Sequence, residues 1–197
     1  MYDCLKKTRL RRPFQTRVRS DHSIASDERG STVVEFALVA PMFFFMMFVI
    51  AQNALIFIAE QVLDNAVFEA TRLIRTGQAQ TGEFDAAAFR TEVCNRASVF
   101  IDCTGDRFYL DVRSAETFEE FAGLSLPEPL DDDDEMKDDD QYDAGGPSSI
   151  VIVRAYYVWP TADIFNGYSF SNAGTGKRLI GSFAAFRNEP FVEESET

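Results

Sequence analysis

Side chains that support catalysis are scarce in this chain of 197 residues. Its single histidine is His22, so the sequence beyond it holds no imidazole for a Ser-His-Asp or Cys-His arrangement. No glycine-rich phosphate loop follows a predicted strand, and no pair of carboxylates is set apart by its spacing for acid–base work. We therefore expect that the protein is not an enzyme and that it holds no cofactor.

Two of the three cysteines have a spacing that suits a disulfide. Cys94 and Cys103 are separated by eight residues, enough for the chain to turn and close a bond, provided that this region lies in an oxidising compartment. A loop of about ten residues is worth roughly 2.5–3 kcal/mol in the chain-entropy model. Two free buried thiols are the competing interpretation. A metal site is disfavoured, because two cysteines without a nearby histidine supply too few ligands.

An acidic run is the other feature that invites chemistry. Nine acids lie between Asp131 and Asp143, and carboxylate oxygens are the ligands that Ca²⁺ prefers. The spacing does not match a calcium-binding loop, however, because no D-x-[DN]-x-[DN]-G pattern is present. Like charges without apolar residues cannot bury themselves, so we predict a disordered, solvated loop at about 127–147 and no metal site.

An uncharged segment in the first third of the chain decides the class of protein. From Phe36 to Ala59 the chain has 24 residues without a charge, which as a helix would be about 36 Å long and could cross a membrane. Residues 1–30 carry eight basic groups against four acids, so this basic leader is placed in the cytoplasm by the positive-inside rule. The sequence predicts a single transmembrane helix at 31–59, with the remainder outside the cytoplasm.

The transmembrane helix is expected to continue beyond the membrane, over 60–77. An apolar stripe at helical spacing follows the uncharged segment, and it consists of Leu63, Val67, Ala70 and Ile74. Gly77 comes just after a basic last turn, which is typical of a helix C-terminus. We therefore predict one long helix from Ser31 to Thr76 and a second, shorter helix at about 84–96, with Phe84, Ala88 and Val93 on its apolar face.

Three later segments have the composition of strands. Residues 108–112 alternate apolar and polar side chains, as in a half-buried strand with Tyr109 and Asp111 on its other face. Residues 148–160 are rich in β-branched and aromatic residues, and 179–186 is a weaker candidate. The predicted fold class is α+β, in which a long N-terminal helix continues into a small domain, 78–197, with a short antiparallel sheet.

Glu35 is the only charged residue between Ser31 and Ala59, and two interpretations of it are open. It can complete a capping box with Thr32, in which its carboxylate reaches back to free N–H groups at the helix start. Alternatively, an acid inside a membrane is costly and usually has a partner.

The residues around Glu35 resemble a peptidase recognition motif. Gly30, four further residues, Glu35 and an aromatic residue precede the apolar helix, and this arrangement resembles the cleavage motif of type IV prepilins. The resemblance implies a cut between Gly30 and Ser31 by a prepilin peptidase. It also implies that Glu35 pairs with a free N-terminal amine during assembly.

Further motifs extend the resemblance along the exported chain. They are ALVAP in the helix, EATRLIRTGQA at its end, VCNRASVFIDC, IVIVRAYYVW and the terminal AFRNEPF. Together these are similar to the TadE-like family of minor pseudopilins, which serve tight-adherence (Flp) pilus assembly. The long acidic loop and the long leader depart from the family pattern.

The resemblance implies a bacterial inner-membrane protein with its N-terminus in the cytoplasm and its C-terminal domain in the periplasm. The expected partners are other pilins and pseudopilins, the pilus assembly platform and the prepilin peptidase. Nucleic acid is not expected as a partner, because the net charge is −13. The alternative is an uncleaved single-pass anchor that displays a periplasmic binding domain.

Overall fold

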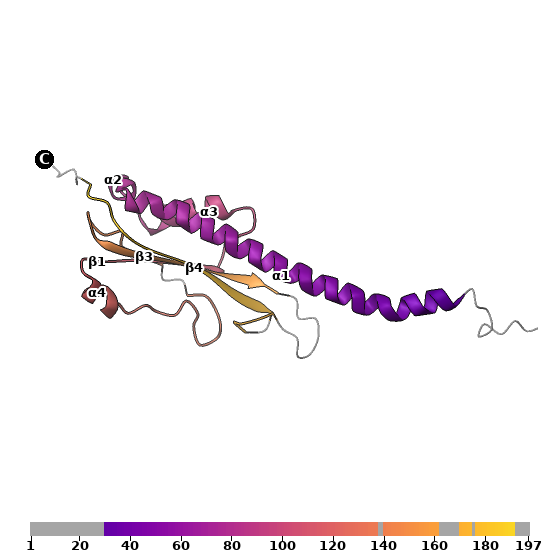
Figure 1. Ribbon diagram of the computed structural model, residues 1–197. Coiled ribbons are helices and arrows are strands. Elements are labelled where there is room, and N and C mark those ends of the chain that lie inside the picture. Colours follow the sequence, from indigo (N-terminus) through magenta and orange to yellow (C-terminus); the bar gives the residue numbers. More distant parts are fainter. Residues whose placement is uncertain (1–29, 138–139, 162–169, 175, 192–197) are drawn as a thin grey trace, which may run out of the picture. The chain divides into compact units, whose positions relative to one another are not determined.

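The structure is a computed structural model that describes residues 30–137, 140–161, 170–174 and 176–191 (Figure 1). The chain falls into two compact units, one up to Met47 and one from Phe48 onward. The predicted leader lies outside the described residues except for Gly30, as do His22 and Cys4.

Helix α1 runs from Ser31 to Arg75 and continues through Pro41. The predicted stripe is confirmed, because all four of its members are buried. The other buried apolar positions of the helix are Ile56, Ala59 and Ala66. The helix ends where Gly77 takes a left-handed conformation with φ of 79°, which glycine adopts without a steric penalty.

Three short helices follow. Helix α2 spans Gln78–Thr81, α3 spans Ala86–Ala97 and α4 spans Phe118–Gly123. Asp85 caps α3 by accepting a hydrogen bond from the Ala88 amide at 2.7 Å. The apolar face of α3 differs from the prediction, because Ala88 is exposed. The face that packs inward is Phe89, Val93 and Ala97, which keeps the spacing of four residues.

Four strands form one sheet in the order β2-β1-β3-β4. They are β1 (Phe108–Ala115), β2 (Gln141–Tyr142), β3 (Ile150–Pro160) and β4 (Lys177–Arg187). β3 pairs antiparallel with both β1 and β4, which agrees with the three predicted strands. β2 pairs parallel to β1, so the sheet is mixed and not purely antiparallel. The α+β fold class is confirmed.

Both faces of the sheet are covered. Figure 1 shows α1 and α3 on one side of the sheet and α4 on the other. The main core joins the buried residues of α1 and α3 to the inner face of β1, β3 and β4. On the opposite face a smaller cluster contains Tyr109, Met136 and Val158. Residues 108–112 are therefore buried on both sides, and the prediction of a half-buried strand is wrong for this segment.

The acidic segment makes defined contacts where it is described. Leu130 and Met136 form an isolated β-bridge. Asp131 accepts hydrogen bonds from the backbone amides of Asp133 at 3.0 Å and Glu135 at 2.8 Å. With β2 in its second half, the segment expected as a disordered loop holds more local structure than its composition indicates, because carboxylates bind backbone N–H groups that would otherwise need water.

Candidate functional site

Gly30 is the last residue before α1 and is exposed. A Cβ built at this position would meet no atom of the described residues within 4 Å. The φ angle of Gly30 is not positive, so its conformation does not require glycine. Neither packing among the described residues nor backbone geometry requires a glycine at this position.

Ser31 and Glu35 lie next to each other on the first turns of α1. The Ser31 hydroxyl Oγ donates a hydrogen bond to Glu35 Oε1 at 3.2 Å, and both residues are exposed. The helix begins at Ser31, so Thr32 lies inside the first turn and not at the N-cap position of the predicted capping box. The geometry brings the Glu35 carboxylate close to the residue whose amine the predicted cut would free.

The first half of α1 presents an apolar surface. None of the residues from Ser31 to Leu55 is buried. The exposed residues of this stretch include large apolar side chains such as Val39, Met42, Phe44 and Ile50. By length and composition, the helix could span a membrane. A carboxylate at the start of such a helix, with an apolar surface along it, can attract a cation while the helix packs against other helices.

The covered part of α1 begins earlier than the predicted membrane boundary at Ala59. Ile56 and Ala59 already belong to the main core. The uncharged segment that the core leaves free is therefore 36–55, which as a helix is about 30 Å long. That length matches a hydrocarbon core of about 30 Å, so the free segment is still long enough to cross a membrane.

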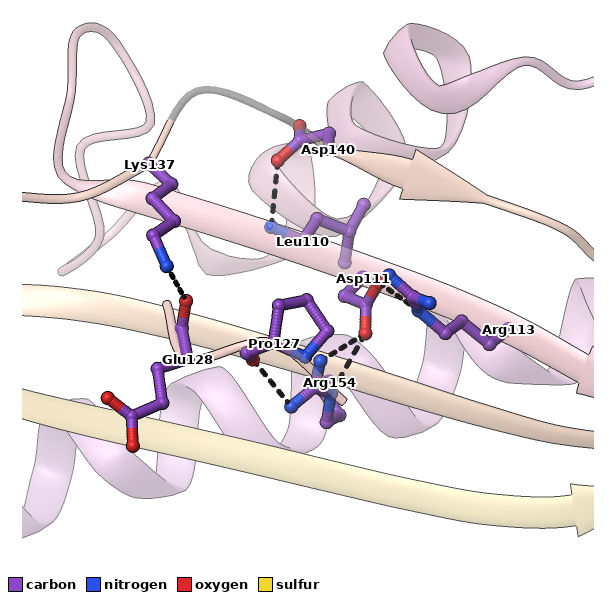
Figure 2. Close-up of polar contacts among 8 residues, drawn as sticks. All are labelled: Leu110, Asp111, Arg113, Pro127, Glu128, Lys137, Asp140 and Arg154. Carbon is purple, nitrogen blue, oxygen red and sulfur yellow. Dashed lines mark hydrogen bonds and ion pairs between the residues drawn. The ribbon is translucent and has the colours of Figure 1, made fainter. Parts of the chain in front are cut away.

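A cluster of buried ion pairs lies on the face of the sheet opposite the main core (Figure 2). Asp111 of β1 is 0% exposed and Arg154 of β3 is 5% exposed. Arg154 Nε donates to Asp111 Oδ2 at 2.9 Å, and Arg154 Nη2 binds the same oxygen. Arg113 Nε donates to Asp111 Oδ1 at 2.8 Å. Both carboxylate oxygens are thus satisfied by guanidinium groups, as a buried charge requires.

The same arginine binds the segment that covers this face. Arg154 Nη1 donates to the carbonyl oxygen of Pro127 at 3.1 Å, and Lys137 Nζ donates to the carbonyl oxygen of Glu128 at 2.9 Å (Figure 2). The cluster therefore fixes the stretch before the acidic run against the sheet.

A second ion pair attaches the end of the acidic run. Arg90 of α3 pairs with Asp140 and donates to the Phe108 carbonyl at 2.9 Å, while its guanidinium lies 5.1 Å from the Phe108 ring centroid. Asp140 Oδ1 accepts from the Leu110 amide at 2.9 Å. Asp140, one acid of the run, thus attaches the run to β1 and α3.

Cys94 and Cys103 form the predicted disulfide, with 5.9 Å between their Cα atoms. The bond joins the end of α3 to the segment that leads into β1. Both residues pack against the main core. Its location gives the bridge a stabilising role.

Among the described residues of this unit, Asp102 and Tyr142 have a shifted pKa. The hydroxyl and amide of Thr104 donate to Asp102 and lower the pKa of its carboxyl. Burial, with the charges of Asp85 and Asp143 nearby, raises the pKa of Tyr142 to about 12. The Tyr142 ring packs 5.5 Å from that of Phe89 between centroids.

The cluster of Asp111, Arg113 and Arg154 was not predicted from the sequence. Asp111 was placed on the face of a strand that was expected to meet solvent. A signal was present, because one acid in FYLDV and one arginine in IVIVRAYYVW are isolated charges of opposite sign in apolar strands. Among the described residues, no group of three His, Cys, Asp or Glu side chains is placed to hold a metal ion.

Comparison with known protein families gives a match at the N-terminal helix. The model of the family described as TadE-like protein matches residues 30–72. No curated protein and no solved structure matches the chain. The matched segment begins at Gly30 and includes Ser31, Glu35 and the whole exposed apolar part of α1. Over residues 30–72 the chain is thus similar to the family described as TadE-like protein, the family that its sequence motifs resemble.

Proposed function

We propose that this protein is a minor pseudopilin of the TadE-like kind that takes part in tight-adherence (Flp) pilus assembly. It acts without catalysis, through helix packing in the membrane and protein contacts outside it. The observation that carries the proposal is that the family match begins at Gly30, the residue before the predicted cut and before the first residue of α1.

The proposed location is the bacterial inner membrane, with residues 1–30 in the cytoplasm and the sheet-containing unit in the periplasm. Three features support it: the basic leader, the apolar segment and a disulfide in the unit placed outside. The proposed partners are other pilins and pseudopilins, the assembly platform and the prepilin peptidase.

The Glu35 carboxylate is proposed to attract the free amine of a neighbouring pilin subunit as the helix enters the assembly. Its position supports this role, since Glu35 lies at the start of the helix beside Ser31 and is exposed. In a medium of low polarity an exposed carboxylate is costly, so pairing with an amine would favour lateral packing.

Gly30→Leu is expected to block cleavage completely, because a bulky side chain would not fit a peptidase site that accepts glycine. The structure supplies a clean test, since nothing lies within 4 Å of an added Cβ and the substitution should not disturb α1. Mass spectrometry of the protein from membranes that contain the peptidase measures the result. The wild-type chain should start at Ser31 and the variant should keep its leader.

The control is Gly123→Leu, at another glycine with open space around an added Cβ, which should be cleaved normally. A wild-type chain that keeps its leader, and so differs from Gly30→Leu only by the mass of the substitution, would reject processing at this site. That outcome would favour the alternative function, an uncleaved single-pass anchor that displays a periplasmic binding domain.

Glu35→Gln is expected to insert and to be cleaved, yet to fail to support piliation. Glutamine keeps an oxygen that can accept the Ser31 hydrogen bond, but it removes the charge that an amine would pair with. Electron microscopy of pili on cells that carry the variant measures the result. Glu35→Asp is the matched control that keeps the charge, and normal piliation with Glu35→Gln would assign Glu35 a structural role only.

A further inference from the structure

Strand β4 is an edge of the sheet, and among the described residues part of its outer side has no main-chain partner. β4 has β3 as its neighbour in the sheet. The Leu179 amide donates to Asn172 Oδ1 at 2.6 Å, and the Leu179 carbonyl accepts from Asn172 Nδ2 at 3.1 Å. The main-chain N–H and C=O groups of Leu179 therefore point away from β3. The Asn172 side chain forms the hydrogen bonds with them that a neighbouring strand would otherwise form.

Along an antiparallel strand the main-chain N–H and C=O groups of successive residues point alternately to the two neighbouring sides. Every second residue of β4 therefore points outward, as Leu179 does. The residues whose N–H and C=O groups point outward are spaced by two, and within β4 after Leu179 they are Gly181, Phe183, Ala185 and Arg187. At the far end the Glu189 amide donates to the Arg75 carbonyl at 2.9 Å. The outer edge is thus occupied near Leu179 and at Glu189, while the described residues supply no main-chain partner for the four positions between them.

Most of this open stretch lacks the usual protection of an edge strand, because its one charge, Arg187, lies at its end. Edge strands commonly carry a charge, a proline or a bulge that prevents pairing with another chain. Residues 179–186 contain no charge and no proline. The Phe183 side chain is 60% exposed, and its ring meets that of Tyr156 edge to face at 5.3 Å between centroids.

A groove of about 730 Å³ runs beside the open edge, between β4 and α1. Its apolar lining includes Phe68 of α1 and, from β4, Ala184 and Phe186, which pack on the same side of the sheet as α1. Phe183 also borders the groove, but its ring packs with Tyr156 on the opposite face. The hydrogen bond from Glu189 to Arg75 joins the C-terminal ends of the two elements. A strand added to β4 would therefore lie in this groove, with apolar side chains on both walls.

An exposed arginine, Arg72, lines the groove near the C-terminal ends of α1 and β4. Arg72 has no carboxylate partner among the described residues, whereas Arg75 is paired with Glu189 at 3.5 Å. Glu69, which also lines the groove, lies one turn earlier on α1. Arg187, the next outward position of β4, is also exposed, and the hydrogen bond resolved for its side chain goes to the Ser148 carbonyl.

We propose that the open edge at 181–187 binds an extended, acidic segment of a partner protein, which adds a strand to the sheet beside β4. Main-chain hydrogen bonds would supply affinity, and Arg72 and Arg187 would select carboxylates. A second copy paired antiparallel through β4 fits less well, because α1 runs alongside β4 toward the same end and would be reversed in that copy. The inference concerns the sheet-containing unit and does not depend on cleavage at Gly30.

The test uses the full chain in detergent micelles and three synthetic peptides with blocked ends. The first alternates threonine and valine and carries two glutamates, the second has lysines in place of the glutamates, and the third is the glutamate peptide with a central proline. Amide hydrogen exchange at 181–187 is measured by mass spectrometry at millimolar peptide. The glutamate peptide should slow exchange about tenfold, and the proline peptide should leave exchange unchanged because it cannot extend the ladder.

Two variants locate the binding. Ala185→Pro removes an outward N–H that β3 does not use, which edge strands tolerate, and it should abolish the protection. Arg72→Glu lies outside the strand and should shift the preference from the glutamate peptide to the lysine peptide. The proposal is overturned if the wild-type chain shows no slowing with the glutamate peptide, if Ala185→Pro retains it, or if the two charged peptides act equally on the wild-type chain.

Discussion

Asp111→Ala is expected to lower the free energy of unfolding by about 3–5 kcal/mol. The carboxylate is fully buried and receives hydrogen bonds from Arg154 and Arg113. Removing it leaves the Arg154 guanidinium buried without a counter-charge, which costs more than the ion pair contributes when it is intact. The single tryptophan, Trp159 on β3, reports unfolding by fluorescence in a urea titration of the detergent-solubilised chain.

Asp132→Ala is the matched control for this prediction. Asp132 is exposed and should change the free energy of unfolding by no more than about 0.5 kcal/mol. The double variant Asp111→Leu with Arg154→Met should recover most of the loss, because apolar side chains of similar volume often replace a buried ion pair without penalty. A cost for Asp111→Ala no larger than that for Asp132→Ala would show that the pair is not buried in solution.

The cluster also explains how far the sequence could predict the second face of the sheet. Asp111 and Arg154 are 43 residues apart, and their contact depends on the register of β1 with β3. Alternation along 108–112 indicates which side chains share a face, but not what covers that face. The covering stretch is polar, so its composition predicted a solvated loop. Its attachment through Pro127 and Asp140 is a consequence of tertiary contacts.

The features that could be predicted are those encoded locally. The apolar stripe of α1 has helical spacing, and a helix with such a stripe needs a surface to cover it. The motif from Gly30 to Glu35 is contiguous, so it is visible without a structure. The helix start at Ser31 agrees with the prediction, and it excludes the capping box proposed for Thr32. One detail was not predicted: the domain covers α1 from Ile56 onward, which depends on where the core begins.

Leu63→Ala is expected to lower the free energy of unfolding by about 2.7–5 kcal/mol. Leu63 is 0% exposed and belongs to the main core, in which α1 packs with the sheet and α3. Truncation to alanine removes buried apolar atoms and leaves a cavity that close-packed neighbours fill only in part. The second half of α1 would thus be a core element of the sheet-containing unit and not a separate stalk.

Phe68→Ala, five residues further along the same helix, is the control that separates packing from helix propensity. Phe68 is the larger side chain, yet it is 75% exposed, so its removal should cost far less than that of Leu63 in the same Trp159 titration. Alanine favours the helix at both positions, so propensity cannot produce a difference in this direction. A larger loss for Phe68→Ala would contradict the packing of α1. A larger loss for Leu63→Ala would mean that the unit cannot unfold without exposing the apolar stripe of α1. A force that acts on the sheet-containing unit would then be transmitted to α1 through the core.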